Sequence, residues 1–325
     1  LCAGCGSKVT GDALSRALSR LPQNSRADVL SRPGDDAAVL DLGARRQVLT
    51  TDHLRAFTAD PELFARITAV HALGDVWAMG ALPQAALANV ILPRMAERLQ
   101  SRTLAQILHA AADVFSAAGA DLVGGHSTMG AEMTLGFTLT GLTDGMTIGH
   151  DGARAGDAIV LTRPVGTGAV LVAEMAGRAR GADVMDMLHA MARPQGDAAA
   201  ILRDAHAMTD VTGFGLAGHL GALCLASGLT ARLELSAIPV YAGAIAAVEA
   251  GHLSVLHAAN RRAAAVSGGT GPVATLLHDP QTAGGLLAAV SPAQVDDLLV
   301  ALRAAGHTGA RIGTFAKGPP VIRAV

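Results

Sequence analysis

Aromatic residues and lysines are scarce in this chain of 325 residues. Phe, Trp and Tyr together make up 2% of it, and only Lys8 and Lys317 are lysines among the 25 basic residues. Three cysteines, two of them in the first five residues, cannot build a disulfide framework, so the sequence favours a reducing compartment, the cytoplasm. Half of the residues are hydrophobic. The chain is therefore long and apolar enough to bury a sizeable core, and its length predicts two domains.

Other absences exclude whole classes of protein. No segment holds about 18 uninterrupted apolar residues, which argues against a membrane span, and no basic stretch precedes an apolar one as in a signal peptide. The 25 basic residues are balanced by 27 acidic ones, whereas nucleic-acid binders usually carry a basic excess. There is no short-period repeat, and no Walker A, HExxH or GxSxG motif.

The hydrophobic pattern alternates between strands and helices in both halves of the chain. Short apolar runs predict strands, and apolar residues at three- and four-residue spacing predict helices. The expected strands are at 46–51, 86–92, 122–123, 133–142, 158–162, 229–235, 286–290 and near 321. The expected helices are at 61–77 (amphipathic), 104–118, 167–178, 184–192, 212–227 and 292–305. The pattern pauses at 152–156, which predicts the boundary between two α/β domains.

The N-terminal segment CAGCGSK (residues 2–8) joins a thiol to an ammonium group. A lysine three residues from Cys5 favours the thiolate, and the glycines let the backbone close over a ligand. Because the chain otherwise uses arginine, Lys8 indicates a need for a compact point charge. The segment therefore predicts a nucleophile, with a terminus carrying incidental cysteines as the alternative. Cys224 lies in an apolar helix and is expected to be an ordinary core residue.

Several acidic residues stand where a purely structural role does not suit them. Asp35 and Asp36 are adjacent before a small apolar run, although most such pairs cap a turn or face solvent. Asp75 lies in the last turns of a predicted helix, where the helix dipole disfavours a carboxylate, so we expect a cation beside it. Asp52 is predicted at the end of a buried strand, where ligands bind in α/β domains.

Glycine-rich segments follow two of the predicted strands. Gly124 and Gly125, with His126 after them, are expected to close a strand, either at a closely approaching ligand or at a simple bulge. Residues 209–216 place Asp210 at a strand end before a glycine-rich helix start, where amides suit phosphate and the carboxylate suits a metal. Residues 279–286 are predicted to be a rigid structural turn. Dispersed carboxylates and glycine turns favour a Mg²⁺-bridged polyphosphate.

Seven motifs, in order along essentially the whole chain, resemble those of the selenophosphate synthetase (selenide, water dikinase) family in the aminoimidazole ribonucleotide synthetase-like superfamily. They lie at residues 3–8, 35–39, 50–52, 72–80, 124–127, 209–216 and 279–285. The resemblance implies a two-domain α/β (α+β) fold of mixed sheets packed with helices. It also implies that ATP, selenide and water become selenophosphate, AMP and phosphate.

The resemblance assigns roles residue by residue. Cys5 falls on the family's catalytic cysteine or selenocysteine, and Lys8 on its essential lysine. The Mg²⁺ ligands of the family fall on Asp36, Asp75 and Asp210. Its ATP-contacting positions fall on Lys8, Asp35, Asp52, Asp75, Gly124, Gly125 and His126. ATP is then a substrate and Mg²⁺ the cofactor, with K⁺ left open as a further cation.

The resemblance also implies an organisation and partners. Residues 1–35 would be a flexible catalytic segment, 36–154 the ATP- and Mg²⁺-binding domain, and 155–325 the C-terminal domain. The protein would be a cytoplasmic homodimer in which the N-terminal domains share a barrel, with ATP and selenide as ligands and neither nucleic acid nor membrane as partner. A start directly at the motif resembles the version fused behind a flavin-dependent oxidoreductase domain, and truncation explains it equally well.

Two departures and three alternatives stay open. Ser7 stands where many members of the family have a second cysteine, and Gly34 replaces an arginine often found before the acidic pair. Thiamine-monophosphate kinase would share the acids and the fold without needing a cysteine–lysine segment. The hydrogenase-maturation dehydratase ends in a reactive cysteine, whereas this chain ends in valine. A C-x-x-C redox module normally follows a strand, and no strand precedes Cys2.

Overall fold

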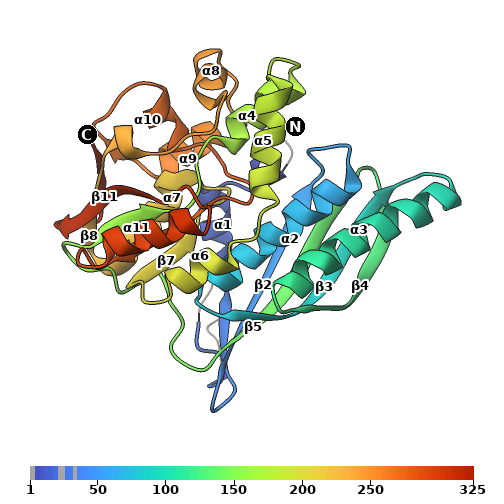
Figure 1. The fold of residues 1–325 in the computed structure, drawn as a ribbon, viewed down its shortest axis with the longest axis horizontal. Coiled ribbons are helices and arrows are strands. Elements are labelled where there is room, and N and C mark those ends of the chain that lie inside the picture. Colours follow the sequence, from blue (N-terminus) through green and yellow to red (C-terminus); the bar gives the residue numbers. More distant parts are fainter. Residues whose placement is uncertain (1–3, 21–25, 32–34) are drawn as a thin grey trace. The chain divides into compact units, whose positions relative to one another are not determined.

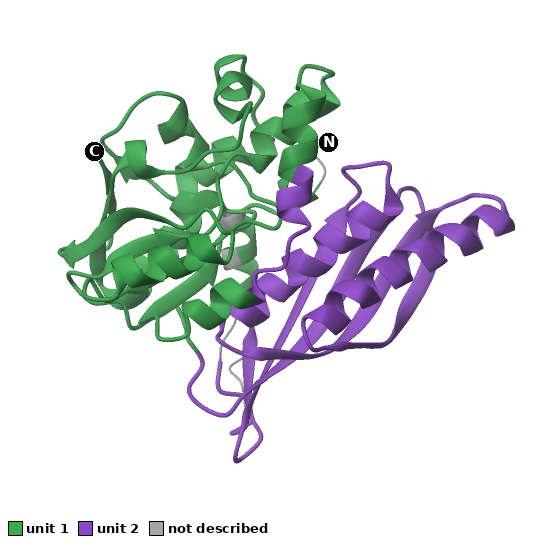
Figure 2. Ribbon diagram, in the orientation of Figure 1, with its two compact units in different colours: residues 1–23, 148–187, 197–325 green, residues 24–147, 188–196 purple. Residues whose placement is uncertain are grey.

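The computed structural model describes residues 4–20, 26–31 and 35–325. It divides into two compact units, coloured in Figure 2. Unit 1 contains residues 1–23, 148–187 and 197–325, and unit 2 contains residues 24–147 and 188–196. The chain therefore starts in unit 1, passes through unit 2 twice and ends in unit 1. The division into segments 1–35, 36–154 and 155–325 stays a prediction.

Unit 2 is a 5-stranded sheet in the order β1-β2-β5-β3-β4 with two long helices on one face (Figure 1). β3 and β4 run parallel and the other neighbours antiparallel. The sheet confirms the strands expected at 46–51, 86–92 and 133–142; the first two extend further than predicted, and the third is shifted by one residue. The elements are β1 (Ala38–Asp41), β2 (Arg46–Arg55), α2 (Pro61–Ala78), β3 (Leu82–Pro93), α3 (Glu97–Ala117), β4 (Asp121–Gly130) and β5 (Thr134–Thr143).

Helix α2 begins where the sequence predicted it. Asp60 is its N-cap, and its side chain accepts hydrogen bonds from the backbone N–H groups of Glu62 and Leu63 at 2.9 and 3.1 Å, which satisfies donors that a helix start leaves open. The helix is not amphipathic, however. Buried side chains occur on nearly all its sides, because it packs against β2, β3 and β5 and also against α3. The sequence predicted a single buried face for this helix and so underestimated how many of its residues are buried.

Unit 1 is built on a 7-stranded sheet in the order β7-β10-β6-β11-β8-β12-β9, where β12 is parallel to β8 and β9 and the other pairs are antiparallel. Every residue of β6, β7 and β10 is buried. The strands are β6 (Ala158–Leu161), β7 (Ala207–Asp210), β8 (Leu229–Leu233), β9 (Val266–Ser267), β10 (Leu286–Val290), β11 (Ala310–Lys317) and β12 (Ile322–Ala324).

Short helices surround this sheet, and the N-terminal segment contributes two of them, η1 (Gly4–Ser7) and α1 (Gly11–Leu18), of which α1 contacts α9 (His257–Ala263) (Figure 1). The helices are η1 (Gly4–Ser7), α1 (Gly11–Leu18), α4 (Thr167–Met175), α5 (Gly181–Met191), α6 (Gly196–Ile201), α7 (Gly215–Ser227), η2 (Leu235–Ala237), α8 (Ala244–Glu249), α9 (His257–Ala263), α10 (Pro272–Leu276) and α11 (Val295–Ala304). Cys224 is fully buried in α7, and burial raises the pKa of its thiol to about 11. Its predicted core role is confirmed. Among the described residues, no helix is both long and apolar enough for a membrane crossing.

Candidate active site

Unit 2 brings two of the predicted nucleotide-contacting acids into one seam between β2 and α2. Thr50 and Asp52 are two residues apart on β2 and so face the same side of the sheet, and His71 and Asp75 are four apart on α2. Thr50 Oγ1 donates a hydrogen bond to Asp75 Oδ2 at 2.5 Å, and His71 Nε2 lies 3.4 Å from Asp52 Oδ2. The Asp52 side chain is only 11% exposed. Sequence reasoning placed these two carboxylates separately, and the structure makes them neighbours.

Asp52 does not end its strand, contrary to expectation. Strand β2 continues to Arg55, because β5 pairs with it over its full length. Asp52 thus occupies a rigid position in mid-strand rather than a loop. The partner that holds it, His71, was missed, although a histidine one helical turn before Asp75 is a readable signal.

The acidic pair before β1 has two different environments. Asp35 is exposed, and its Oδ1 accepts a hydrogen bond from the backbone N–H of Asp36 at 3.0 Å. Asp36 is half-buried, and Ala37 after it is buried. Asp35 therefore organises the local turn, as the structural reading allowed, while Asp36 brings its carboxylate toward the protein interior.

The glycine pair lies inside β4 and does not close it. The register with β3 shifts between Leu122 and Gly124, which leaves one extra residue on β4. Gly125 has φ +153°, and a Cβ there would lie 2.0 Å from the carbonyl oxygen of Ala88. Gly125 is thus required by the bulge and by close backbone packing, whereas a Cβ at Gly124 would meet only Leu87 Cδ2 at 3.5 Å, an ordinary contact. His126 is exposed on this edge strand.

Asp210 lies at the carboxyl end of β7, as predicted, and is 2% exposed. A carboxylate oxygen of Asp210 and a ring nitrogen of His219 on α7 are within 4.8 Å of each other. The backbone N–H of Thr212 donates to His219 Nε2 at 3.1 Å, so this nitrogen carries no proton. Nδ1, 3.3 Å from Thr209 Oγ1, is then the protonated nitrogen of the neutral ring. His219, which sequence reasoning also missed, is a positioning residue for this loop.

The loop after Asp210 is tied down by the segment predicted to be a structural turn. The N–H of Val211 donates to the carbonyl of Gly285 at 2.9 Å, and the N–H of Gln281 donates to the carbonyl of Thr212 at 3.0 Å. Helix α7 starts only at Gly215, which has φ +72°. The spacing G-x-G-x-x-G at 213–218 does not mark a dinucleotide fold here, since β7 pairs antiparallel with β10 rather than in a parallel βαβ unit.

The same turn caps helix α4 with two side chains. Gln281 Oε1 accepts hydrogen bonds from the N–H groups of Gly166 and Thr167 at 2.9 and 3.1 Å, and Asp279 Oδ2 accepts one from Gly168 at 2.9 Å. These bonds replace the partners that the first turn of a helix lacks. Residues 279–281 therefore fix the start of α4 and, through Gln281, the loop that carries Asp210.

Asp279 predicts a pH dependence of stability. It is fully buried, and burial raises its pKa from 3.8 to about 7 despite the hydrogen bonds it accepts. The folded protein thus keeps a proton that the unfolded chain loses, so this group lowers the free energy of unfolding progressively as pH rises from about 4 to about 7. We expect Asp279→Asn to lose that slope in urea titrations over this range. An unchanged slope in the variant would contradict this.

The N-terminal segment forms one 3₁₀ turn within unit 1. Ser7 Oγ donates to the carbonyl of Gly4 at 2.9 Å. Gly6, Gly168 and Pro280 line one small cavity, so the turn lies beside the start of α4. Lys8 follows it and is half-buried. The Cys5 side chain, Cys2 and Gly34 lie outside the described residues and side chains.

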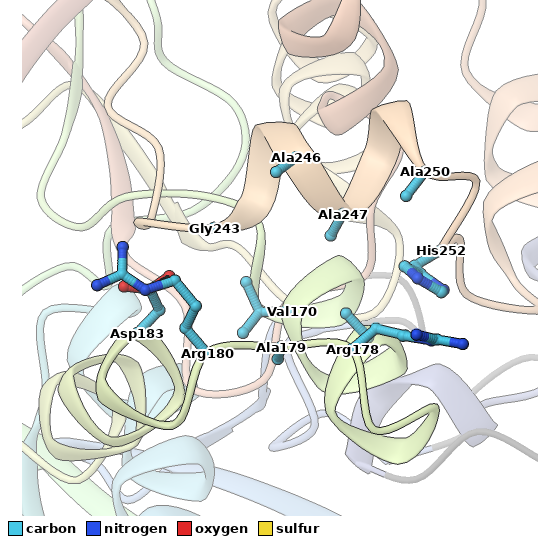
Figure 3. Close-up of a pocket in the computed structure, with 11 residues that line it drawn as sticks. Val170, Arg178, Ala179, Arg180, Asp183, Gly243, Ala246, Ala247, Ala250 and His252 are labelled. Carbon is cyan, nitrogen blue, oxygen red and sulfur yellow. Dashed lines mark ion pairs between the residues drawn. The ribbon is translucent and has the colours of Figure 1, made fainter.

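A cavity of about 570 Å³ in unit 1 contains none of the motif residues (Figure 3). Alanines of α8 face Val170 of α4 across it, with Arg178 and His252 at one end. Arg180 and Asp183 at the other end form an ion pair at 4.0 Å, with the Arg180 side chain 82% exposed. This groove between helices is therefore separate from the chemistry that the motifs predict.

Comparison with known proteins identifies the class to which this fold and these motifs belong. Residues 34–143 match the N-terminal domain of AIR synthase related proteins, and residues 154–324 match their C-terminal domain. Among solved structures, thiamine-monophosphate kinase from Stenotrophomonas maltophilia superposes with a TM-score of 0.69 at 22% identity over 98% of this chain and 96% of that one. Hydrogenase maturation protein HypE in complex with ATP gives 0.64 at 22% identity over 94% and 87%. The chain has the AIR synthase-related fold.

Curated relatives narrow the class further. "Selenide, water dikinase" of Burkholderia pseudomallei is 39% identical over 97% of this chain and 92% of its own length. The protein of the same name from Bdellovibrio bacteriovorus is 33% identical over 95% and 92%. This chain belongs to the selenide, water dikinase family. The resemblance inferred from seven motifs is confirmed.

Proposed function

We propose that this protein is a selenide, water dikinase, which converts ATP, selenide and water into selenophosphate, AMP and phosphate. The observation that carries the proposal is the match to proteins of that name over 95% or more of the chain at 33–39% identity. The cysteine–lysine segment supports it over a thiamine-monophosphate kinase, which would not need such a segment. A cytoplasmic location would keep that thiol reduced.

The acids would act on Mg²⁺ and ATP. Asp36, Asp75 and Asp210 offer hard carboxylate oxygens, the donors that Mg²⁺ prefers. Two of them are already oriented by their surroundings: Asp75 by the Thr50 hydroxyl, and Asp210 by its place at the end of β7 in a loop that His219 holds. This donor set fits Mg²⁺, which when bound would neutralise phosphate charge. Asp35, Asp52, Gly124, Gly125 and His126 are proposed to contact the nucleotide, and K⁺ remains a candidate for a further cation.

Cys5 and Lys8 would act on selenide and the transferred phosphoryl group. Cys5 would act as the thiolate nucleophile predicted from the sequence, and the ammonium of Lys8 would place a point charge at the phosphate, while selenium keeps its oxidation state throughout. The 3₁₀ turn separates the two by a fixed short distance along the chain. Both residues therefore belong to one short segment, whose 3₁₀ turn lies beside the start of α4, and the chemistry would depend on that segment.

Lys8→Arg tests the compact-charge role. We expect the variant to lose nearly as much selenide-dependent activity as Lys8→Ala, about a hundredfold or more, because a planar guanidinium is larger than an ammonium group. Steady-state assays of the wild type and the two variants measure this. Retention of most of the activity by Lys8→Arg would show that charge alone suffices.

The exposed edge of unit 2 supports a homodimer. Strand β4 is at the edge of the sheet and exposed along most of its length, and it presents Val123 and Met129, each 62% exposed. Leu87 on the neighbouring β3 is 45% exposed. An edge strand with exposed apolar residues is a pairing surface that a soluble monomer normally avoids. We propose that two copies join through these strands into a shared barrel.

Light scattering at micromolar concentration tests the dimer. We expect the mass of a dimer for the wild type and the mass of a monomer for Val123→Arg, since a charge on the pairing edge opposes association. Val300→Arg is the matched control, because Val300 is 65% exposed but lies on α11 of unit 1. A monomeric wild type, or dissociation of both variants, would contradict the proposed surface.

The nucleotide product tests the proposed function. Incubated anaerobically with Mg²⁺, ATP and selenide, the protein should form AMP, and AMP formation should depend on selenide. A thiamine-monophosphate kinase would form ADP only when thiamine monophosphate is supplied. Chromatography of the nucleotides after each incubation separates the two activities. ADP formed with thiamine monophosphate, and no AMP formed with selenide, would assign the chain to the alternative.

A further inference from the structure

A polar cavity of about 280 Å³ lies in unit 1, and none of its described lining residues belongs to the seven motifs. Helix α9 contributes His257 and Arg261 to it, the loop 268–271 (GGTG) forms another wall, and His278 lies beyond the end of α10. None of its described lining residues is acidic, whereas Arg261 is cationic and exposed. Its volume is near the lower end of the ~300–1,000 Å³ typical of small-molecule sites. The lining therefore suits a small anion.

His278 is a buried residue in the lining of this cavity. It is only 5% exposed, and its buried Nδ1 has no hydrogen-bond partner within the described part of the chain. Burial, followed by the positive charge of His257 and Arg261, lowers its pKa to about 4. The ring is therefore neutral near pH 7, with one N–H donor. Buried polar groups normally have partners, and this Nδ1 can gain one if the ring, which lines the cavity, rotates toward a bound anion.

His257 is fixed next to His278. The two ring centroids are 6.0 Å apart with the planes at 89°. His257 Nε2 lies 3.1 Å from the carbonyl oxygen of Thr275, and because a carbonyl only accepts, this nitrogen carries a proton. The cavity thus has a preformed wall of two imidazoles rather than mobile surface side chains.

The glycine-rich loop lines the cavity mostly with backbone. Gly268 has φ +77°, and a Cβ there would lie 2.4 Å from the carbonyl oxygen of Ala324. Gly269 has φ +72°, and its Cβ would lie 2.7 Å from Leu235 Cδ1. The back of the loop is therefore packed too closely to accept larger residues. Only Thr270 within it supplies a side chain, a hydroxyl that can donate to an anion.

The cavity shares a wall with the loop that carries Asp210. The Asn260 side-chain nitrogen donates hydrogen bonds to the carbonyls of His278 and Gly213 at 3.1 and 3.0 Å. A Cβ at Gly215 would lie 2.9 Å from the carbonyl carbon of His278. A ligand that orders His278 would therefore act on a residue in direct contact with that loop.

We propose that this cavity binds a small phosphate-type oxyanion, held by Arg261, His278 and Thr270. Arg261 supplies the charge, the neutral imidazole and the hydroxyl supply hydrogen bonds, and the glycine loop allows close approach of the anion to the backbone. Free phosphate and a small phosphate monoester share this chemistry. Binding here is measured without turnover, so its failure is distinguishable from a failure of the proposed dikinase activity.

Calorimetric titration of the full chain with inorganic phosphate, and separately with glycerol 3-phosphate, tests the proposal. Arg261→Gln should weaken binding about tenfold, the effect of one charge-assisted hydrogen bond. Arg262→Gln is the matched control: the neighbouring arginine is also exposed in the last turn of α9 but does not line the cavity. Tighter binding of the monoester would identify a phosphorylated metabolite as the ligand, and equal or tighter binding of phosphate would identify the free ion.

Histidine-ring NMR locates the bound anion. With either probe at saturation, the ring resonances of His278, assigned by comparison with His278→Gln, should shift in the wild type and in Arg262→Gln. The proposal is overturned if those resonances stay unchanged at saturation, or if Arg261→Gln binds both probes as tightly as Arg262→Gln does.

Discussion

Replacing Cys5 with serine is expected to abolish selenide-dependent turnover, by roughly a thousandfold or more, while Mg²⁺–ATP binding stays near the wild-type value. The reason is the acidity of the thiol. It can form an anionic nucleophile near neutral pH, whereas a serine hydroxyl of similar size stays protonated. Anaerobic rate measurements, together with calorimetric titration of Mg²⁺–ATP, separate the two effects.

Ser7→Ala is the matched control for this prediction. Ser7 lies in the same 3₁₀ turn, where its hydroxyl donates only to the carbonyl of Gly4 among the interactions of the described residues. We expect it to retain most of the activity. Selenophosphate production by Cys5→Ser at the wild-type rate would end the assignment of Cys5, and an equal loss in both variants would indicate damage to the turn rather than to the chemistry.

Asp75→Asn is expected to weaken Mg²⁺-dependent ATP binding by about ten- to a hundredfold, with similar losses for Asp36→Asn and Asp210→Asn. Each change removes an anionic oxygen ligand and keeps the size of the side chain. For Asp75 the loss should be large, because Thr50 holds this carboxylate in place at the β2–α2 seam. Titration with Mg²⁺–ATP by calorimetry gives the affinities.

Asp296→Asn and Asp297→Asn are the controls for the three carboxylates. Both residues are exposed in the first turn of α11, where an acid simply complements the helix dipole. Neither change should alter nucleotide affinity. If two of the three Asp→Asn variants bind Mg²⁺–ATP as tightly as the wild type, the proposed metal-ligand set is wrong. At least one of these acids then has a structural role only.

The local pattern predicted many of the elements but not the positions of residues within them. The Asp60-Pro61 start of α2 was readable, because the capping chemistry is local. Asp52 was expected at a strand end because the apolar pattern covers only residues 46–51. That pattern cannot show that pairing with β5 extends the strand to Arg55. Burial of α2 on nearly all sides likewise depends on α3, which is distant in sequence.

Close backbone approaches explain the remaining differences. Strand β11 was not predicted because Gly313 interrupts its pattern, yet a Cβ there would lie 2.1 Å from the carbonyl oxygen of Arg232 on β8. Gly125 was read as a strand end for the same reason. The candidate acids were found from the motifs, whereas their partners His71 and His219 were not, since both act through tertiary contacts.

Direct observation of the phosphorus–selenium bond tests the central claim most directly. The protein is incubated anaerobically with Mg²⁺, ATP and selenide labelled with a magnetic selenium isotope, and the products are followed by phosphorus NMR. The account predicts a new phosphorus resonance split by coupling to selenium, which grows in step with AMP and phosphate. ATP consumed with no selenium-coupled phosphorus signal would contradict it.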